Sequence, residues 1–115
     1  MKKPIDRDRL QHILDAIEKV ERYLNGIGPA EFVANDEKVD AVVRNIEIIG
    51  EAATTLSREL KSGHAEVEWR FAAAMRNRLI HGYFEVDPQI VWSTVKNDIP
   101  KFKVDIVKII KELEN

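Results

Sequence analysis

The chain has 115 residues, which suits one domain with one hydrophobic core and leaves no room for a second domain of ordinary size. Apolar residues make up 44% of the chain and charged residues 33%, a composition that argues against intrinsic disorder. The 20 acidic and 18 basic residues give a formal net charge of −2, which predicts no general affinity for nucleic acid, so any nucleic-acid site must be a local patch.

The scarcity of certain residue types narrows the chemistry further. The chain has no cysteine, which excludes disulfide bonds, thiolate catalysis and cysteine-ligated zinc. Its three histidines, His12, His64 and His81, form no metal-binding pattern, so we expect neither a metal nor a cofactor. The first residues contain no signal-peptide core, and no apolar run approaches the roughly 18 residues that a membrane span needs. We therefore expect a cytoplasmic protein with no membrane partner.

The first predicted helix begins near Asp6 or Asp8, either of which can cap it. It ends at residues 25–29, where glycine and proline stop helical structure. Between these limits the apolar residues recur at helical spacing, at Leu10, Ile13, Leu14, Ile17 and Val20. The short stretch 30–34 is expected to form one further turn.

A second helix is predicted from a cap at Asn35 or Asp36 to about Leu60. Its apolar stripe comprises Val42, Ile46, Ile49, Ala53 and Leu56, and an adjacent polar stripe comprises Asp40, Arg44, Glu47 and Glu51. Gly50 lies inside this helix, where glycine costs about 1 kcal/mol relative to alanine. We therefore expect another helix backbone to come close at this position.

A loop at residues 61–64 precedes a third predicted helix from about 66 to 81. Residues 71–75 of that helix are apolar on every side, a pattern typical of a helix buried among partners, and Gly82 is a natural left-handed stop. A fourth helix starts at Asp87-Pro88 and is broken or kinked by Pro100. No strand is predicted. The expected fold is all-α, an up-and-down bundle of four to five helices.

One segment stands out for its charge. Residues 69–83 contain Arg70, Arg76 and Arg78 and no acidic residue, which makes this the one clear basic patch of an acidic chain. The segment also places His81 where the third predicted helix stops. Histidine and arginine suit the cleavage of RNA without a metal. In that reaction a base must take the proton of the ribose 2′-hydroxyl, and a cation must stabilise the charge that builds on the phosphate. Histidine titrates near neutral pH, and arginine binds phosphate through a planar, permanently charged fork.

The spacing of these residues limits how they can meet. Asn77 and Arg78 precede His81 by four and three residues, so an intact helix would place them beside it. Arg76 precedes His81 by five residues, and an intact helix would point the two in different directions. They can converge if the helix unwinds at Gly82, or if two copies of the helix meet across a dimer interface.

Structural roles also fit these residues. A histidine at a helix end can simply complement the helix dipole, and Arg76 can be a buried structural arginine paired with Glu47 or Glu51. Tyr83 can be an aromatic of the core or its rim. The two remaining histidines are expected at the surface, His12 on a solvent-facing side of its helix and His64 in a loop.

The motif Arg76-x-x-x-x-His81-x-Tyr83 resembles the signature of HEPN-domain ribonucleases (higher eukaryotes and prokaryotes nucleotide-binding domain) and, more narrowly, that of the HepT toxin family. The resemblance covers nearly the whole chain, residues 1–115, as a single HEPN-like helical domain. Its blocks follow in order at residues 6–17, 44–52, 69–70, 75–83, 86–87 and 91–92. The combination of these blocks is far more specific than the arginine–histidine spacing alone.

The resemblance implies an RNA-cleaving toxin that acts as a homodimer, with a composite site at the interface. It implies that Arg76 and His81 are catalytic and that Asn77 and Arg78 lie nearby as polar support, and we add Glu47 to the supporting residues. It also implies a partner antitoxin, a minimal nucleotidyltransferase, which transfers AMP from ATP onto the motif tyrosine, Tyr83.

A second reading comes from a different functional class. Helical domains of this type also resemble the non-catalytic substrate-binding partners of nucleotidyltransferases, in which the basic patch would hold a phosphate or nucleotide. Cleavage of RNA by the purified protein alone separates the two readings. A third reading, a purely structural dimerisation module, leaves the acid-free arginine patch unexplained.

Overall fold

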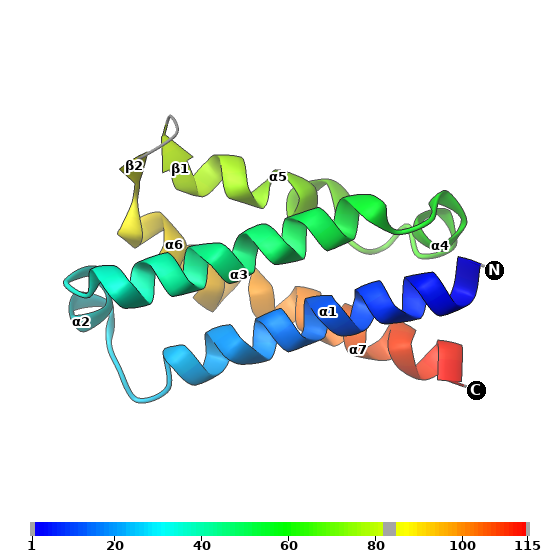
Figure 1. Ribbon diagram of the computed structural model, residues 1–115, viewed down its shortest axis with the longest axis horizontal. Coiled ribbons are helices and arrows are strands. Elements are labelled where there is room, and N and C mark those ends of the chain that lie inside the picture. Colours follow the sequence, from blue (N-terminus) through cyan, green and yellow to red (C-terminus); the bar gives the residue numbers. More distant parts are fainter. Residues whose placement is uncertain (1, 82–84, 115) are drawn as a thin grey trace.

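The computed structural model describes residues 2–81 and 85–114, with side chains described for all of these except 2–4, 76, 79–81 and 85. The described chain contains seven helices and one pair of very short strands (Figure 1). The elements are α1 (Lys2–Tyr23), α2 (Pro29–Val33), α3 (Asp36–Thr55), α4 (Arg58–Gly63), α5 (Trp69–Leu79), β1 (Ile80–His81), β2 (Glu85–Val86), α6 (Pro88–Asn97) and α7 (Ile99–Glu114).

The predicted all-α fold is confirmed, with five helices of ten or more residues among the elements described. Helix α3 packs against α1 on one side and against α5 on the other, and α7 packs on α1 (Figure 1). The short α2 packs on α6. This arrangement places α5, with the basic segment, at one edge of the bundle.

The predicted apolar stripes form the core. In α1 the residues Leu10, Ile13, Ile17 and Val20 are fully buried, and all five members of the stripe predicted for the second helix are buried, four in α3 and Leu56 just after it. Helix α7 adds Phe102, Ile106, Ile109 and Ile110. Each fully buried large apolar side chain contributes roughly 1.5–3 kcal/mol, so the packing of α1 on α3 and on α7 contributes much of the stability.

Gly50 lies where α3 and α5 come closest, as expected from its position inside a helix. A Cβ atom added at Gly50 would lie 3.2 Å from the backbone oxygen of Ala72 and 3.6 Å from that of Ala73. Because both neighbours are backbone atoms, α5 would have to move to admit a side chain. The glycine therefore sets the distance between α3 and the helix that carries the basic segment.

The prediction that the second helix runs to about Leu60 is wrong. Helix α3 ends at Thr55, Leu56 is extended, and Ser57 caps α4, its hydroxyl accepting from the Leu60 amide at 3.1 Å. The buried carboxylate of Asp6 holds this corner, accepting from the Ser57 amide at 2.9 Å and from its hydroxyl at 2.6 Å. Asp6 is therefore not the cap of the first helix, which already begins at Lys2.

The third predicted helix is shorter at both ends than the sequence suggested. Residues 61–63 are still helical, and α5 begins at Trp69, after a turn in which the Trp69 indole donates to the His64 carbonyl at 3.0 Å. At its other end α5 stops at Leu79, and Ile80 and His81 pair with Val86 and Glu85 as antiparallel strands. No strand was predicted here, because a pair of two residues leaves no alternating pattern to detect.

The remaining predicted boundaries are confirmed. Residues 29–33 form the short helix α2, Asn35 caps α3, and Asp87 caps α6 by accepting from the amides of Gln89 and Ile90. The chain breaks between α6 and α7 at Asp98, two residues before Pro100. Within the described residues, no helix is both long enough and apolar enough to cross a membrane.

Candidate functional site

Helix α5, which carries the basic segment, is buried on one side and exposed on the other. Ala72 and Met75 are fully buried against the core, Phe71 is half-buried, and Ala73 and Ala74 are exposed. The prediction that residues 71–75 are buried on every side is therefore wrong for the single chain. The reason is that α5 lies at an edge of the bundle, packed by α3 and α6, so that its outer side meets solvent.

The backbone places Arg76 and His81 on different elements. Arg76 is in the last turn of α5, four residues after Ala72 and three after Ala73, so its backbone position lies on the flank of α5 that faces α3. His81 lies beyond the helix end, in β1. The helix therefore ends between Arg76 and His81, so the geometry of an intact helix does not apply to this pair. Their side chains, and all of Tyr83, lie outside what the structure describes.

The two polar residues predicted to support the site differ in their surroundings. Asn77 is exposed. Arg78 lies over the Phe71 ring, with its guanidinium carbon 4.9 Å from the centroid, and pairs with Asp98 at 3.6 Å. Residues two positions apart on an α-helix are rotated by roughly 200° about its axis, so Arg78 occupies the flank opposite the Arg76 backbone position. Its described contacts attach α5 to the end of α6.

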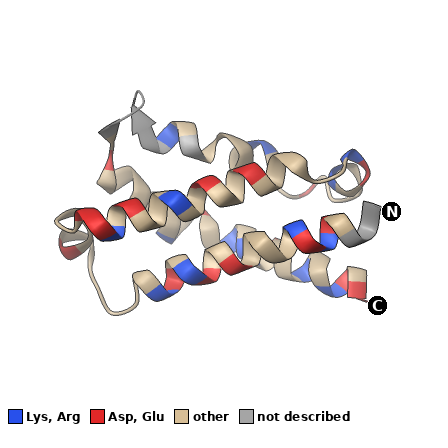
Figure 2. Cartoon of the chain, in the orientation of Figure 1, with Lys and Arg blue, Asp and Glu red and all other residues tan. Residues whose placement is uncertain are grey.

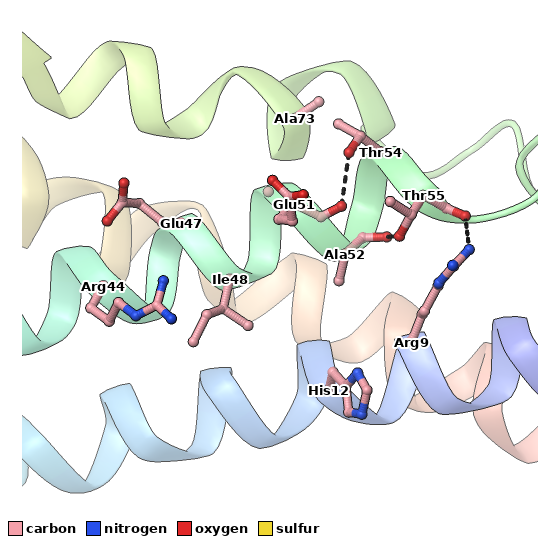
Figure 3. Close-up of a pocket in the computed structure, with 11 residues that line it drawn as sticks. Arg9, His12, Arg44, Glu47, Ile48, Glu51, Ala52, Thr54, Thr55 and Ala73 are labelled. Atoms are coloured by element: carbon pink, nitrogen blue, oxygen red, sulfur yellow. Dashed lines mark hydrogen bonds between the residues drawn. The ribbon is translucent and has the colours of Figure 1, made fainter.

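Glu47 and Glu51 extend from α3 towards α5 (Figure 3). Glu47 is half-buried and Glu51 is exposed. These are the carboxylates that the sequence offered as structural partners for Arg76. That pairing, and the supporting role assigned to Glu47, depend on an arginine side chain outside the described part of the structure.

A hollow of about 630 Å³ opens on the face formed by α1, α3 and α5 (Figure 3). Its lining combines cationic, imidazole, carboxylate and hydroxyl groups: Arg9, His12, Arg44, Glu47, Ile48, Gly50, Glu51, Ala52, Thr54, Thr55 and Ala73. Sequence reasoning placed His12 only at the surface, where it lies, and left Arg44 in a polar stripe. The spacing of Arg9 and His12 on one helix was a usable signal, but nothing in the sequence brings α1 and α3 together.

His64 lies in the turn that follows α4, as the sequence predicted, and its side chain also links two helices. Its Nδ1 lies 3.0 Å from the Leu60 carbonyl oxygen and its Nε2 lies 2.9 Å from a carboxylate oxygen of Glu112 in α7. Both neighbours are acceptors, so only the protonated ring satisfies both. The hydrogen bond with Glu112 accordingly raises the pKa of His64 above its usual 6.5. This residue ties α4 to α7, away from the basic segment.

The distribution of charge gives the face of α5 its character. Figure 2 shows acidic and basic residues mixed along α1, α3 and α7, whereas the charged residues in the described part of α5 are all basic. Among the described residues, no group of three or more histidine, aspartate or glutamate side chains could hold a metal ion. The charged side chains that the described part of α5 itself contributes are those of Arg70 and Arg78.

Residues 13–109 match the family described as Ribonuclease HepT-like. The chain belongs to the HepT-like ribonuclease family. The match runs from α1 into α7 and includes α5, β1 and β2, so the family resemblance read from the sequence is confirmed.

Curated relatives of the HepT-like chain carry ribonuclease names. It is 41% identical over 105 residues to a protein of Thermococcus cleftensis named as a probable ribonuclease HepT, covering 91% of the chain and 96% of the relative. It is 38% identical over 112 residues to a candidate RNase of Caldanaerobacter subterraneus subsp. tengcongensis, covering 97% and 98%. A Methanocaldococcus jannaschii protein, named as a gamma-glutamylcyclotransferase and candidate RNase, is 43% identical over 91% of the chain and 47% of its own length. No solved structure matches the chain.

Proposed function

We propose that this protein is a metal-independent endoribonuclease, the toxin of a cytoplasmic toxin–antitoxin pair, and that residues 1–115 act as one HEPN-like domain. The observation that carries the proposal is the Arg76-x4-His81-x-Tyr83 motif inside the family match, at the end of a helix whose described charges are all basic. The catalytic residues of the proposal are Arg76 and His81, supported by Asn77, Arg78 and Glu47.

The proposed reaction is a transesterification within the RNA. His81 takes the proton from a ribose 2′-hydroxyl, and the 2′-oxygen attacks the adjacent phosphorus while the bond to the 5′-oxygen breaks. The leaving oxygen takes a proton from a protonated histidine or from water, which leaves a 2′,3′-cyclic phosphate and a 5′-hydroxyl end. Arg76 stabilises the negative charge on the phosphate oxygens as the new bond forms.

The proposal includes a homodimer with the composite site at its interface. Ala74 and Asn77 are exposed on the outer side of α5, where a small residue such as Ala74 allows a second helix to approach closely. Two copies of the motif would then supply one histidine as base and another as acid. Light scattering at micromolar concentration tests this part, because a strict monomer has no composite site.

The proposed control is covalent. The partner, a minimal nucleotidyltransferase antitoxin, transfers AMP from ATP to Tyr83: the phenol oxygen attacks the α-phosphorus, its proton is lost, and pyrophosphate leaves. The new phosphodiester places negative charge two residues from His81 and next to the arginines of the segment, where it competes with the RNA backbone.

The experiment that tests the proposed function is incubation of total cellular RNA with the purified protein, without its partner and in EDTA, followed by mapping of the RNA ends. Discrete cuts with 2′,3′-cyclic phosphate ends are the expected result. RNA that stays intact with or without metal would favour the alternative, a non-catalytic nucleotide-binding partner of a nucleotidyltransferase.

A further inference from the structure

The hollow between α1, α3 and α5 combines charges of both signs at separate places. Figure 3 shows Arg44 towards one end of the α3 segment that lines it and Glu51 further along the same helix, with His12 on α1, away from the Arg44 end. Arg44 and Glu51 are seven residues apart, so they share a face of α3 and lie roughly 10 Å apart along its axis. A ligand in the hollow therefore meets a cation and a carboxylate about one nucleotide's length apart.

These groups are available to a ligand. Arg44, Glu51 and His12 are exposed, and within the described residues their side chains make no hydrogen bond or ion pair. Arg9, by contrast, is committed to the fold, because its guanidinium donates to the carbonyl of Thr55 at the end of α3. Arg44 is therefore the cation of this hollow that a phosphate can recruit without loss of an existing bond.

The hollow also lies close to the backbone position of Arg76. Ala73 forms part of its wall and lies one helical turn before Arg76, on the flank of α5 that faces α3. A strand of RNA with its scissile phosphate at Arg76 would thus pass directly into the hollow. A volume of about 630 Å³ falls in the range of roughly 300–1,000 Å³ typical of small-molecule sites and suits about one nucleotide.

We propose that this hollow is a nucleotide-recognition subsite of the ribonuclease, a proposal that rests on the function proposed above. Arg44 binds a phosphate next to the cut, and Glu51 accepts a hydrogen bond from the base. Single-stranded RNA exposes its base edges for such contacts. A carboxylate repels phosphate and accepts from exocyclic amino groups, so Glu51 favours cytosine, adenine or guanine over uracil.

The test measures binding of 2′-O-methyl oligoribonucleotides, which cannot be cut because the attacking hydroxyl is blocked. Oligo(C) and oligo(U) form the matched pair, since cytosine carries an amino group where uracil carries an oxygen. Fluorescence anisotropy at several salt concentrations compares the wild type with Arg44→Ala, Arg44→Lys and Glu51→Gln. Arg22→Ala is the control, because Arg22 is an exposed arginine of α1 that lines a different hollow.

We expect Arg44→Ala to weaken binding of both oligonucleotides about tenfold. The plot of log affinity against log salt should become less steep by about 0.7, the share of one phosphate contact. Arg44→Lys should keep most of the slope. Glu51→Gln should remove the preference for oligo(C) over oligo(U). On cleavable RNA, Arg44→Ala should raise KM and leave kcat near that of the wild type.

Three results would overturn this subsite. The Arg44→Ala variant could bind as tightly as the Arg22→Ala variant, or the wild type could bind neither oligonucleotide. The third result is that the Arg44→Ala substitution converts a dimer into a monomer. The last result assigns the hollow to contact between copies of the chain. A wild type that binds through Arg44 but leaves cleavable RNA intact rejects the proposed nuclease and retains the nucleotide site, so the two failures are distinct.

Discussion

Asp6→Ala removes the one buried carboxylate that joins the start of α1 to the corner between α3 and α4 in the described chain. Two charge-assisted hydrogen bonds are lost, to the Ser57 amide and to its hydroxyl, and the Ser57 amide is left without its acceptor. Bonds to charged groups typically contribute about 1.5–3 kcal/mol each, and Ser57 is half-exposed, so we expect a loss of about 2–4 kcal/mol.

This loss converts into a clear shift of the melting temperature. Unfolding entropy of about 2.1 cal/mol/K per residue gives about 4 °C per kcal/mol for a chain of this length, so Tm should fall by about 8–16 °C. Asp8→Ala is the matched control, because Asp8 is exposed on the same helix, and its effect should stay within about 2 °C. Thermal unfolding followed by circular dichroism measures both variants.

The reasoning also predicts coupling between the two partners. Ser57→Ala alone should destabilise the protein, because it loses both the bond to Asp6 and the cap of α4. In the double variant the losses should fall short of the sum by about 0.5–2 kcal/mol. Additive losses, or an Asp6→Ala variant as stable as the Asp8→Ala variant, would refute the conclusion that Asp6 stabilises the turn between α3 and α4 through Ser57.

Three further predictions follow from single features. The raised pKa of His64 means that its bond to Glu112 stabilises the fold fully below pH 6.5 and is lost as pH rises through the raised value, so the Tm difference between wild type and Glu112→Gln should be largest near pH 5.5 and close to zero near pH 9. Gly50→Val should lower stability by about 1–3 kcal/mol by denaturant titration, since its side chain meets the backbone of α5; a neutral effect would contradict the close packing. Tyr83→Phe should fold as the wild type and gain no mass of AMP when co-expressed with the partner nucleotidyltransferase, whereas the wild type should; intact-mass analysis decides this, and an unmodified but neutralised wild type would reject covalent control.

The sequence predicted those parts of the fold that depend on local pattern. The stripes of α1 and α3 and the cap at Asp87 follow from helical spacing and from residues adjacent in the chain. The close approach at Gly50 was also foreseen, because a costly glycine inside a helix suggests a backbone neighbour. Such features need no knowledge of which helices meet.

Most of the errors came from long-range contacts. Helix α3 stops early because Asp6, 51 positions away, holds Ser57 in an extended cap, and nothing near Ser57 announces this. A second error is local, because the pairing of β1 with β2, which ends α5 before His81, is too short to leave an alternating pattern. Arg78 was assigned to the site by its spacing, but its described contacts with Phe71 and Asp98 depend on how α5 sits against α6.

The candidate site divides in the same way. The motif residues were identifiable by residue type and spacing, since Arg76, His81 and Tyr83 lie within eight residues of one another. The hollow was not, because its lining residues on α1 and on α3 meet only through the packing of these two helices. Recognition of a nucleotide next to the cut is therefore a property that tertiary structure supplies.

The central claim is metal-independent RNA cleavage by Arg76 and His81, and one measurement tests it directly. Initial rates of cleavage of a single RNA substrate are compared in EDTA for the wild type, Arg76→Ala and His81→Ala, with Lys108→Ala as a control at an exposed position of α7. We predict cleavage by the wild type and a loss on the order of 10²–10³-fold in kcat for each motif variant, with Lys108→Ala keeping kcat near the wild type. Cleavage that stops in EDTA and returns with Mg²⁺, or His81→Ala as active as the wild type, would contradict it.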